Sequence, residues 1–210
     1  MHLGLDEATA RKQSVAILDR VGIPSAAARY YDYPFQFSGG MRQRVMIAIA
    51  LSCNPLLLIA DEPTTALDVT VQAQLLDLVR DLKEERGMSV IWITHDLGVV
   101  AELCDRVAVM YAGFIVETGP VDKIFENPKH RYTSLLLRAL PSLEERHADQ
   151  LASIGGLPPS LANLKPGCPF APRCDAPVDL CTVENPQLIA VGEEHFAACW
   201  NVFSRGDGES

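Results

Sequence analysis

Two short polar runs follow apolar segments, at the positions where parallel α/β sheets place their ligands. Asp61 and Glu62 come directly after the apolar run 56–60, and His95 comes after the apolar run 88–94. Ligands of such sheets bind beyond the carboxyl ends of the strands, so these side chains are expected at one sheet edge. Asp61 could hold Mg²⁺ through water, Glu62 could polarise an attacking water, and His95 could contact a γ-phosphate. The pattern indicates phosphoryl chemistry.

A second candidate lies in the stretch FSGGMRQRV, which begins at Phe37 and runs into an apolar helical pattern. Ser38, Gly39 and Gly40 stand at the expected start of that helix. Free N–H groups at a helix N-terminus, together with the helix dipole, favour an anion. The three residues are therefore candidates for holding a phosphate, and the plainer alternative is an ordinary helix cap. Arg42 and Arg44 are interpreted as solvated charges on the helix face.

The elements that position these residues form an alternating pattern of strands and helices. Helical spacing of apolar residues predicts helices over 9–23 and 70–86, and the short apolar runs 56–60 and 88–94 predict buried parallel strands. The segments 106–113 and 114–119 predict two further strands that meet at a turn with Gly113. The first part of the chain is thus expected to be an α/β domain with a mostly parallel sheet.

The amino-acid composition argues against some classes of function. The chain has 210 residues, 48% of them hydrophobic, which is enough for a core, and a net charge of −9, which argues against broad nucleic-acid binding. No apolar run approaches the ~20 residues of a membrane span. Proline and cysteine concentrate after Pro141, so we expect a domain over 1–141 and a Cys/Pro-rich extension over 142–210.

Taken in order, these motifs closely resemble the nucleotide-binding subunits of ABC transporters over about residues 5–140. The matching motifs are the signature at Ser38, Gly39 and Gly40, the Walker B end at Asp61 and Glu62, the D-loop at Ala66, Leu67 and Asp68, and the switch histidine at His95. The resemblance implies ATP and Mg²⁺ as cofactors, with Asp61 at the metal and Glu62 as the catalytic carboxylate. It also implies that two subunits bind ATP head to tail, so Ser38, Gly39 and Gly40 would grip a partner's nucleotide.

One motif of the family has no counterpart in these 210 residues. The Walker A loop ends in Gly-Lys-Ser/Thr, and no glycine here is followed by lysine. Only 37 residues precede Ser38. The sequence therefore looks like the C-terminal part of such a subunit, with an ABC-type domain that is incomplete at its N-terminus. A catalytically incompetent remnant and a non-transport ABC ATPase are the two alternatives to a transport ATPase.

Longer matches point to one branch of the family. FSGGMRQRVMIAIAL and DEPTTALDVTVQAQLLDL resemble the dipeptide/oligopeptide and nickel importers, and NPKHRYTSLLLRALP with GCPFAPRC resembles the C-terminal extension of that branch. The resemblance implies an ATPase subunit that works as a homo- or heterodimer on two membrane permease subunits. An extracytoplasmic substrate-binding protein would take part indirectly, and the subunit would lie peripherally on the cytoplasmic face of the membrane.

Four cysteines in the extension form a separate candidate site. Cys168, Cys174, Cys181 and Cys199 do not have zinc-ribbon spacing, and a disulfide framework is not expected in a reducing cytoplasm. A Pro-rich segment with little core of its own suggests a metal staple. Some members of the branch carry an iron–sulfur cluster, so a 4Fe–4S cluster, a zinc ion and free thiols remain open. His195 is interpreted as structural, and Cys53 as a core thiol.

Overall fold

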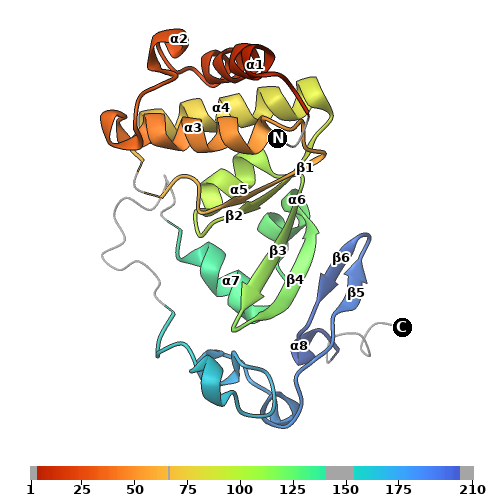
Figure 1. Ribbon diagram of the computed structural model, residues 1–210. Coiled ribbons are helices and arrows are strands. Elements are labelled where there is room, and N and C mark those ends of the chain that lie inside the picture. The colour runs from red at the N-terminus through yellow and green to blue at the C-terminus, as the bar shows by residue number, and fades with distance from the viewer. Residues whose placement is uncertain (1–3, 66, 141–153, 204–210) are drawn as a thin grey trace. The chain divides into compact units, whose positions relative to one another are not determined.

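The computed structural model describes residues 4–65, 67–140 and 154–203, and it divides into two compact units, 1–99 and 100–210 (Figure 1). Each unit is described by itself. The expected domain boundary at 141/142 lies outside the described residues, and so does Ala66 of the D-loop motif. The position of that boundary therefore stays a prediction.

The first unit is a helical layer on a small sheet. Its elements are α1 (Glu7–Arg20), α2 (Ala26–Arg29), a 3₁₀ turn (Pro34–Gln36), α3 (Gly39–Leu51), β1 (Leu57–Asp61), α4 (Val69–Arg86) and β2 (Ser89–Ile93), followed by α5 (Leu97–Leu103), which crosses into the second unit. Side-chain oxygens cap the long helices, which satisfies backbone N–H groups that have no partner within the helix. Asp6 accepts from the Thr9 N–H at the start of α1, and Asp68 accepts from the Val71 N–H at the start of α4, both at 2.9 Å.

Strands β1 and β2 pair in parallel with Leu57 opposite Ser89 and Asp61 opposite Ile93, which confirms the parallel pairing expected from the apolar runs. The helices α1, α3 and α4 lie together along one face of this pair (Figure 1). That face carries Leu58 and Trp92, which join the core made by the three helices. The α/β fold class is therefore confirmed. The expectation of a mostly parallel sheet was wrong, because this is the one parallel pair among the described strands and the pairs of the second sheet are antiparallel.

The opposite face of the same two strands is apolar and open to solvent. Its four aliphatic side chains are exposed by roughly half: Leu57 46%, Ile59 62%, Ile91 48% and Ile93 47%. The expectation of fully buried strands was wrong, because in the part of the first unit that the structure describes the helices cover one face only. We call this surface, with Leu57, Ile59, Ile91 and Ile93, the open sheet face.

The second unit is built around an antiparallel sheet in the order β3-β4-β6-β5. Its elements are β3 (Arg106–Tyr111), β4 (Phe114–Pro120), α6 (Val121–Glu126), α7 (Arg131–Arg138), 3₁₀ turns at Leu161–Asn163, Ala171–Arg173 and Asp179–Thr182, β5 (Ile189–Gly192), β6 (His195–Ala197) and α8 (Trp200–Phe203). The expected turn between β3 and β4 is confirmed. Ala112 and Gly113 both have positive φ, 49° and 85°, as a two-residue hairpin turn of this kind requires.

The extension is packed onto the sheet and helices of this unit. Phe170 is 1% exposed, and its ring packs edge-to-face against Tyr111 of β3 and at a tilt against Tyr132 of α7, with ring centroids 5.2 and 5.3 Å apart. Strand β6 pairs with β4, with Glu117 opposite Ala197. The extension, expected to have little core of its own, therefore shares one, because its apolar side chains complete a core that the preceding strands and helices begin.

Two smaller observations complete the fold. Among the residues that the structure places, no helix combines the length and apolarity needed to cross a bilayer. Cys53, expected in the core, is exposed, because α3 ends at Leu51 and the thiol lies in the turn beyond it.

Candidate functional site

Glu62 and His95 meet at the carboxyl ends of the two parallel strands. The register puts Asp61 opposite Ile93, so both chains leave the sheet at one edge, and the Glu62 N–H donates to the Ile93 carbonyl at 2.9 Å. His95 Nδ1 lies 2.9 Å from Glu62 Oε1. The structure thus brings together two residues that are 33 positions apart and that the sequence singled out independently.

The contact between Glu62 and His95 shifts the pKa values of both side chains. The hydrogen bond from His95 is the main cause that lowers the pKa of Glu62, and a hydrogen bond from Thr65 adds to it. The same contact with the Glu62 carboxylate raises the pKa of His95. Both side chains are open to solvent: Glu62 is 40% exposed and His95 is 82% exposed. Glu62 is therefore ionised at neutral pH, as a group that accepts a proton from water must be.

Asp61 ends β1 next to this pair, and its side chain is exposed. Mg²⁺ in nucleotide sites takes one or two carboxylates and completes its shell with water and substrate phosphates. A single open carboxylate at a strand end fits that requirement. Glu62 has a φ of 46°, an unusual left-handed conformation for a residue with a side chain, so the backbone turns sharply between the two carboxylates.

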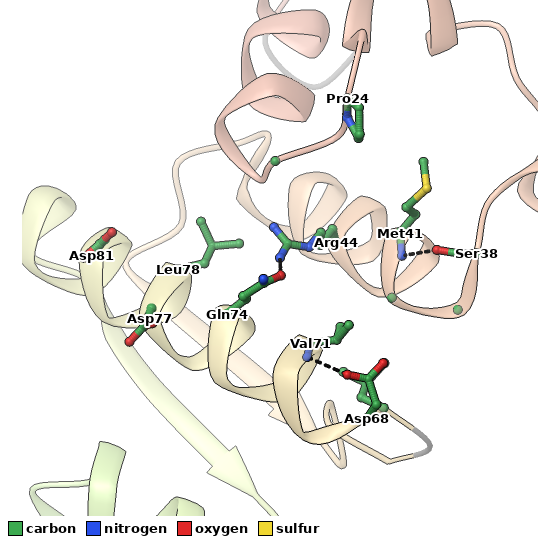
Figure 2. A pocket seen from close by; sticks show the side chains of 14 residues that line it. Pro24, Ser38, Met41, Arg44, Asp68, Val71, Gln74, Asp77, Leu78 and Asp81 are labelled. Atoms are coloured by element: carbon green, nitrogen blue, oxygen red, sulfur yellow. Dashed lines mark hydrogen bonds between the residues drawn. The ribbon is translucent and has the colours of Figure 1, made fainter.

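The signature residues lie at the start of α3. Ser38 Oγ accepts from the Met41 N–H at 3.3 Å, and Gly39 and Gly40 form the first turn of the helix. They line a groove of about 830 Å³ together with Leu67 and Asp68 (Figure 2). Asp61, Glu62 and His95 do not line this groove. The candidate residues therefore form two groups. The first is Asp61, Glu62 and His95 at the strand ends, and the second is the signature residues with Asp68 at the groove.

Arg42 and Arg44, which were interpreted from the sequence as solvated charges, have hydrogen-bond partners in this region. Arg44 donates to the Val21 carbonyl at 2.7 Å and to Gln74 Oε1 at 2.9 Å (Figure 2), and Arg42 donates to the Phe37 carbonyl at 2.8 Å. For Arg44 the expectation was wrong, because its side chain joins α3 to α4 and to the turn after α1, whereas Arg42 is exposed as expected. Helical spacing alone gives no sign of such long-range partners.

The two signature glycines have different surroundings. A Cβ built on Gly40 would lie 2.7 Å from Val71 Cγ1 at the start of α4, whereas one built on Gly39 would meet nothing within 4 Å. Gly40 thus allows α3 and α4 to approach closely, and Gly39 leaves open space in front of the helix start.

Replacing these glycines should separate the two roles. We expect Gly40→Ala to lower the free energy of unfolding by ~1–3 kcal/mol, because the stiff Val71 side chain must move. Gly39→Ala should be neutral or slightly stabilising, because alanine favours the helix and finds room. Denaturant unfolding followed by far-UV circular dichroism measures both variants. Equal stabilities would contradict the packing role of Gly40.

The four cysteines of the extension gather in one region of the second unit. The Cys168 N–H donates to the Cys181 carbonyl at 2.8 Å, and Cys181 and Cys199 lie near enough to Cys168 and Cys174 to influence their pKa values. Burial raises the pKa of Cys168, Cys174 and Cys199, which favours neutral thiols. The donor types suit a metal, but no three His, Cys, Asp or Glu side chains in the described ranges stand close enough to hold one. The side chains as placed do not fit a cluster.

His195 has a structural partner in the same unit, in line with its interpretation from sequence. Its Nε2 lies 2.7 Å from Oε1 of Glu117, and both side chains are almost completely buried. The Glu117 carboxylate also accepts from the N–H groups of Lys129 and His130, at 2.7 and 2.9 Å. Sequence reasoning missed Glu117, because a single carboxylate after the apolar run 114–116 is the only signal that it gives.

Comparisons with known proteins agree with this arrangement. Residues 2–65 match the family model of the ABC transporter, and residues 116–181 match that of the oligopeptide/dipeptide transporter C-terminal region. A Brucella ovis protein named for peptide import and ATP binding is 53% identical over 204 residues, 95% of this chain and 60% of the relative. The oligopeptide transport ATP-binding protein OppD of Bacillus subtilis is 50% identical over 199 residues, 95% of this chain and 56% of OppD.

A solved structure resembles part of the chain. The dimeric structure of MJ0796, described as a bacterial ABC transporter cassette, superposes with a TM-score of 0.50 at 32% identity, covering 56% of this chain and 50% of MJ0796. The chain thus spans about 60% of the length of the curated relatives that it matches.

Proposed function

Since the chain belongs to the family of ABC transporter ATP-binding subunits, we propose that it hydrolyses ATP to power import of di- or oligopeptides. The observation that carries the proposal is the contact of Glu62 with His95 at the ends of parallel strands. A carboxylate that is ionised at neutral pH and held beside a histidine is equipped to polarise water.

The roles of the residues follow from their positions. Asp61 would hold Mg²⁺ through water, and the ion would neutralise charge on the phosphates. Glu62 accepts a proton from the attacking water. His95, exposed beside it, contacts the terminal phosphate and orients the carboxylate.

The second group of residues acts on a different nucleotide. Ser38, Gly39 and Gly40 present a helix N-terminus to the groove and would bind the γ-phosphate held by a second ATPase subunit. Asp68, at the end of the D-loop motif, lies beside them (Figure 2). This division supports the head-to-tail dimer, because one chain then contributes to two sites. The dimeric MJ0796 cassette is consistent with it.

Peptide is the proposed cargo because the relatives named for peptide import and oligopeptide transport match both parts of the chain. The subunit would work on two membrane permease subunits from the cytoplasmic face of the membrane, with a substrate-binding protein outside. Hydrolysis in the assembled transporter that depends on Glu62 tests the proposal.

The 210-residue chain alone should bind ATP weakly or not at all. A phosphate loop normally supplies backbone N–H groups and a lysine to the β- and γ-phosphates, and the sequence contains no Gly-Lys pair. Calorimetric titration with Mg-ATP should show no saturable binding at micromolar concentrations. Micromolar affinity in the monomeric chain would refute this expectation and would also argue against a catalytically incompetent remnant.

The iron–sulfur cluster is the part of the proposal that rests on sequence. The four thiols lie in one region, but in the described residues they do not stand close enough to hold a metal, so a cluster would require their side chains to move together. In that case anaerobically purified protein should be brown, with about four irons per chain. Because burial raises the pKa of three of the thiols, metal binding must displace protons and should strengthen as the pH rises. Colourless protein with one zinc would replace the cluster by zinc, and four titratable thiols without metal would exclude both.

A further inference from the structure

Residues 62–65 form a tight turn with one buried side and one solvent-exposed side. The Thr65 N–H donates to the Glu62 carbonyl at 3.2 Å, and the Glu62 N–H is already fixed to the Ile93 carbonyl. Between them Pro63 and Thr64 are buried and anchor the turn. The side chains of Glu62 and Thr65 consequently lie on the solvent side of the turn, close to each other.

The two oxygens of Glu62 have different partners. Thr65 Oγ1 donates to Glu62 Oε2 at 2.9 Å, while Oε1 lies 2.9 Å from His95 Nδ1. Rotation about the last torsion of a glutamate side chain is broad and almost unrestrained. Two partners on two different oxygens remove that freedom. The carboxylate plane is therefore set by the turn on one side and, on the other, by His95, two residues beyond the end of β2.

We propose that Thr65 is a positioning residue that, through its hydroxyl, fixes the carboxylate of Glu62 against His95. The inference rests on the proposed function for its consequence in catalysis, but the hydrogen bonds stand without it. A carboxylate that polarises water acts only in a narrow range of orientations, because reacting atoms must be aligned. Thr65 restricts Glu62 to one orientation before nucleotide arrives.

The test compares Thr65→Val, which removes the hydroxyl and keeps the shape, with Thr65→Ser, which keeps the hydroxyl. The readout is the NMR titration of the His95 ring in the chain as it stands, assigned with His95→Gln. Glu62 raises the pKa of His95, and the nearby Asp96 contributes in the same direction. Thr65→Val should move the pKa of His95 towards its ordinary value, and Thr65→Ser should leave it unchanged. Glu62→Gln should lower it most, because the carboxylate of Glu62 is removed and only Asp96 still raises the pKa.

The outcomes separate this inference from the function. A Thr65→Val chain whose His95 titrates as in the wild type, while Glu62→Gln shifts it, would overturn the positioning role and leave Glu62 as the proposed base. In the assembled ATPase we expect Thr65→Val to lower kcat roughly ten- to a hundredfold with KM for ATP unchanged, and Thr65→Ser to restore it. An assembly without ATPase activity but with the expected titrations would reject the function and keep the hydrogen-bonded arrangement.

Discussion

Glu117→Ala should lower the free energy of unfolding of the second unit by ~3–5 kcal/mol. Its carboxylate is fully buried and accepts hydrogen bonds from His195 and from the N–H groups of Lys129 and His130. Alanine would leave the buried donors of His130 and His195 and the half-buried N–H of Lys129 without an acceptor, and each buried group retains its desolvation cost. The hairpin of β5 and β6 should then detach from β4. Hydrogen exchange read by mass spectrometry over 189–199 measures this directly.

The chain offers a matched control for that change. Arg106 of β3 pairs with Glu194 at 2.7 Å and joins the same hairpin to the same sheet, but both side chains are exposed. Arg106→Gln should therefore cost less than about 1 kcal/mol. Similar losses for Glu117→Ala and Arg106→Gln would show that the buried carboxylate is not the anchor of the hairpin.

The pH of the measurement matters, because His130 packs beside Glu117. Burial lowers the pKa of His130 to about 4, whereas an unfolded histidine titrates near about 6.5. The folded unit thus binds fewer protons than the unfolded chain between these values, and acidification through that window destabilises it. Unfolding is best compared at about pH 8, where the histidine is neutral in both states.

Glu62→Gln should reduce ATP turnover by the assembled transporter by ~10²–10⁴ while nucleotide binding persists. The amide keeps the shape of the side chain and its contact with Thr65, but it cannot accept a proton from water. Turnover is measured by phosphate release, and binding by retention of labelled nucleotide. Glu84→Gln on the exposed side of α4 is the control and should hydrolyse ATP normally. Wild-type turnover in Glu62→Gln would reject the role of Glu62.

Sequence reasoning reached the parallel strands and their shared edge because these depend on local patterns. Apolar runs as short as 56–60 have the length of strands, and polar residues directly after them mark the strand ends. Parallel pairing then fixes which ends coincide, so the meeting of Glu62 and His95 followed. The cap at Ser38, the plainer alternative for that motif, is equally local, since its hydroxyl bonds an N–H three residues ahead.

Long-range partners could not be predicted in the same way. Glu117 and His195 are 78 residues apart, and nothing in the composition of either segment indicates the other. Arg44 finds partners 23 and 30 residues away. The exposure of one face of β1 and β2 could not be predicted either. An apolar run indicates that a strand can be buried on both faces, but it does not indicate how many faces other elements cover.

The open sheet face affects how the chain behaves at high concentration. Leu57, Ile59, Ile91 and Ile93 form a flat aliphatic surface, and two molecules that meet there remove apolar area from water. The net charge of −9 opposes such encounters. That repulsion reaches only about 10 Å at ~0.1 M salt and less above it. The colloidal stability of the chain is therefore a balance between a short-range attraction and a salt-dependent repulsion, and dilute, low-salt buffers favour the dispersed state.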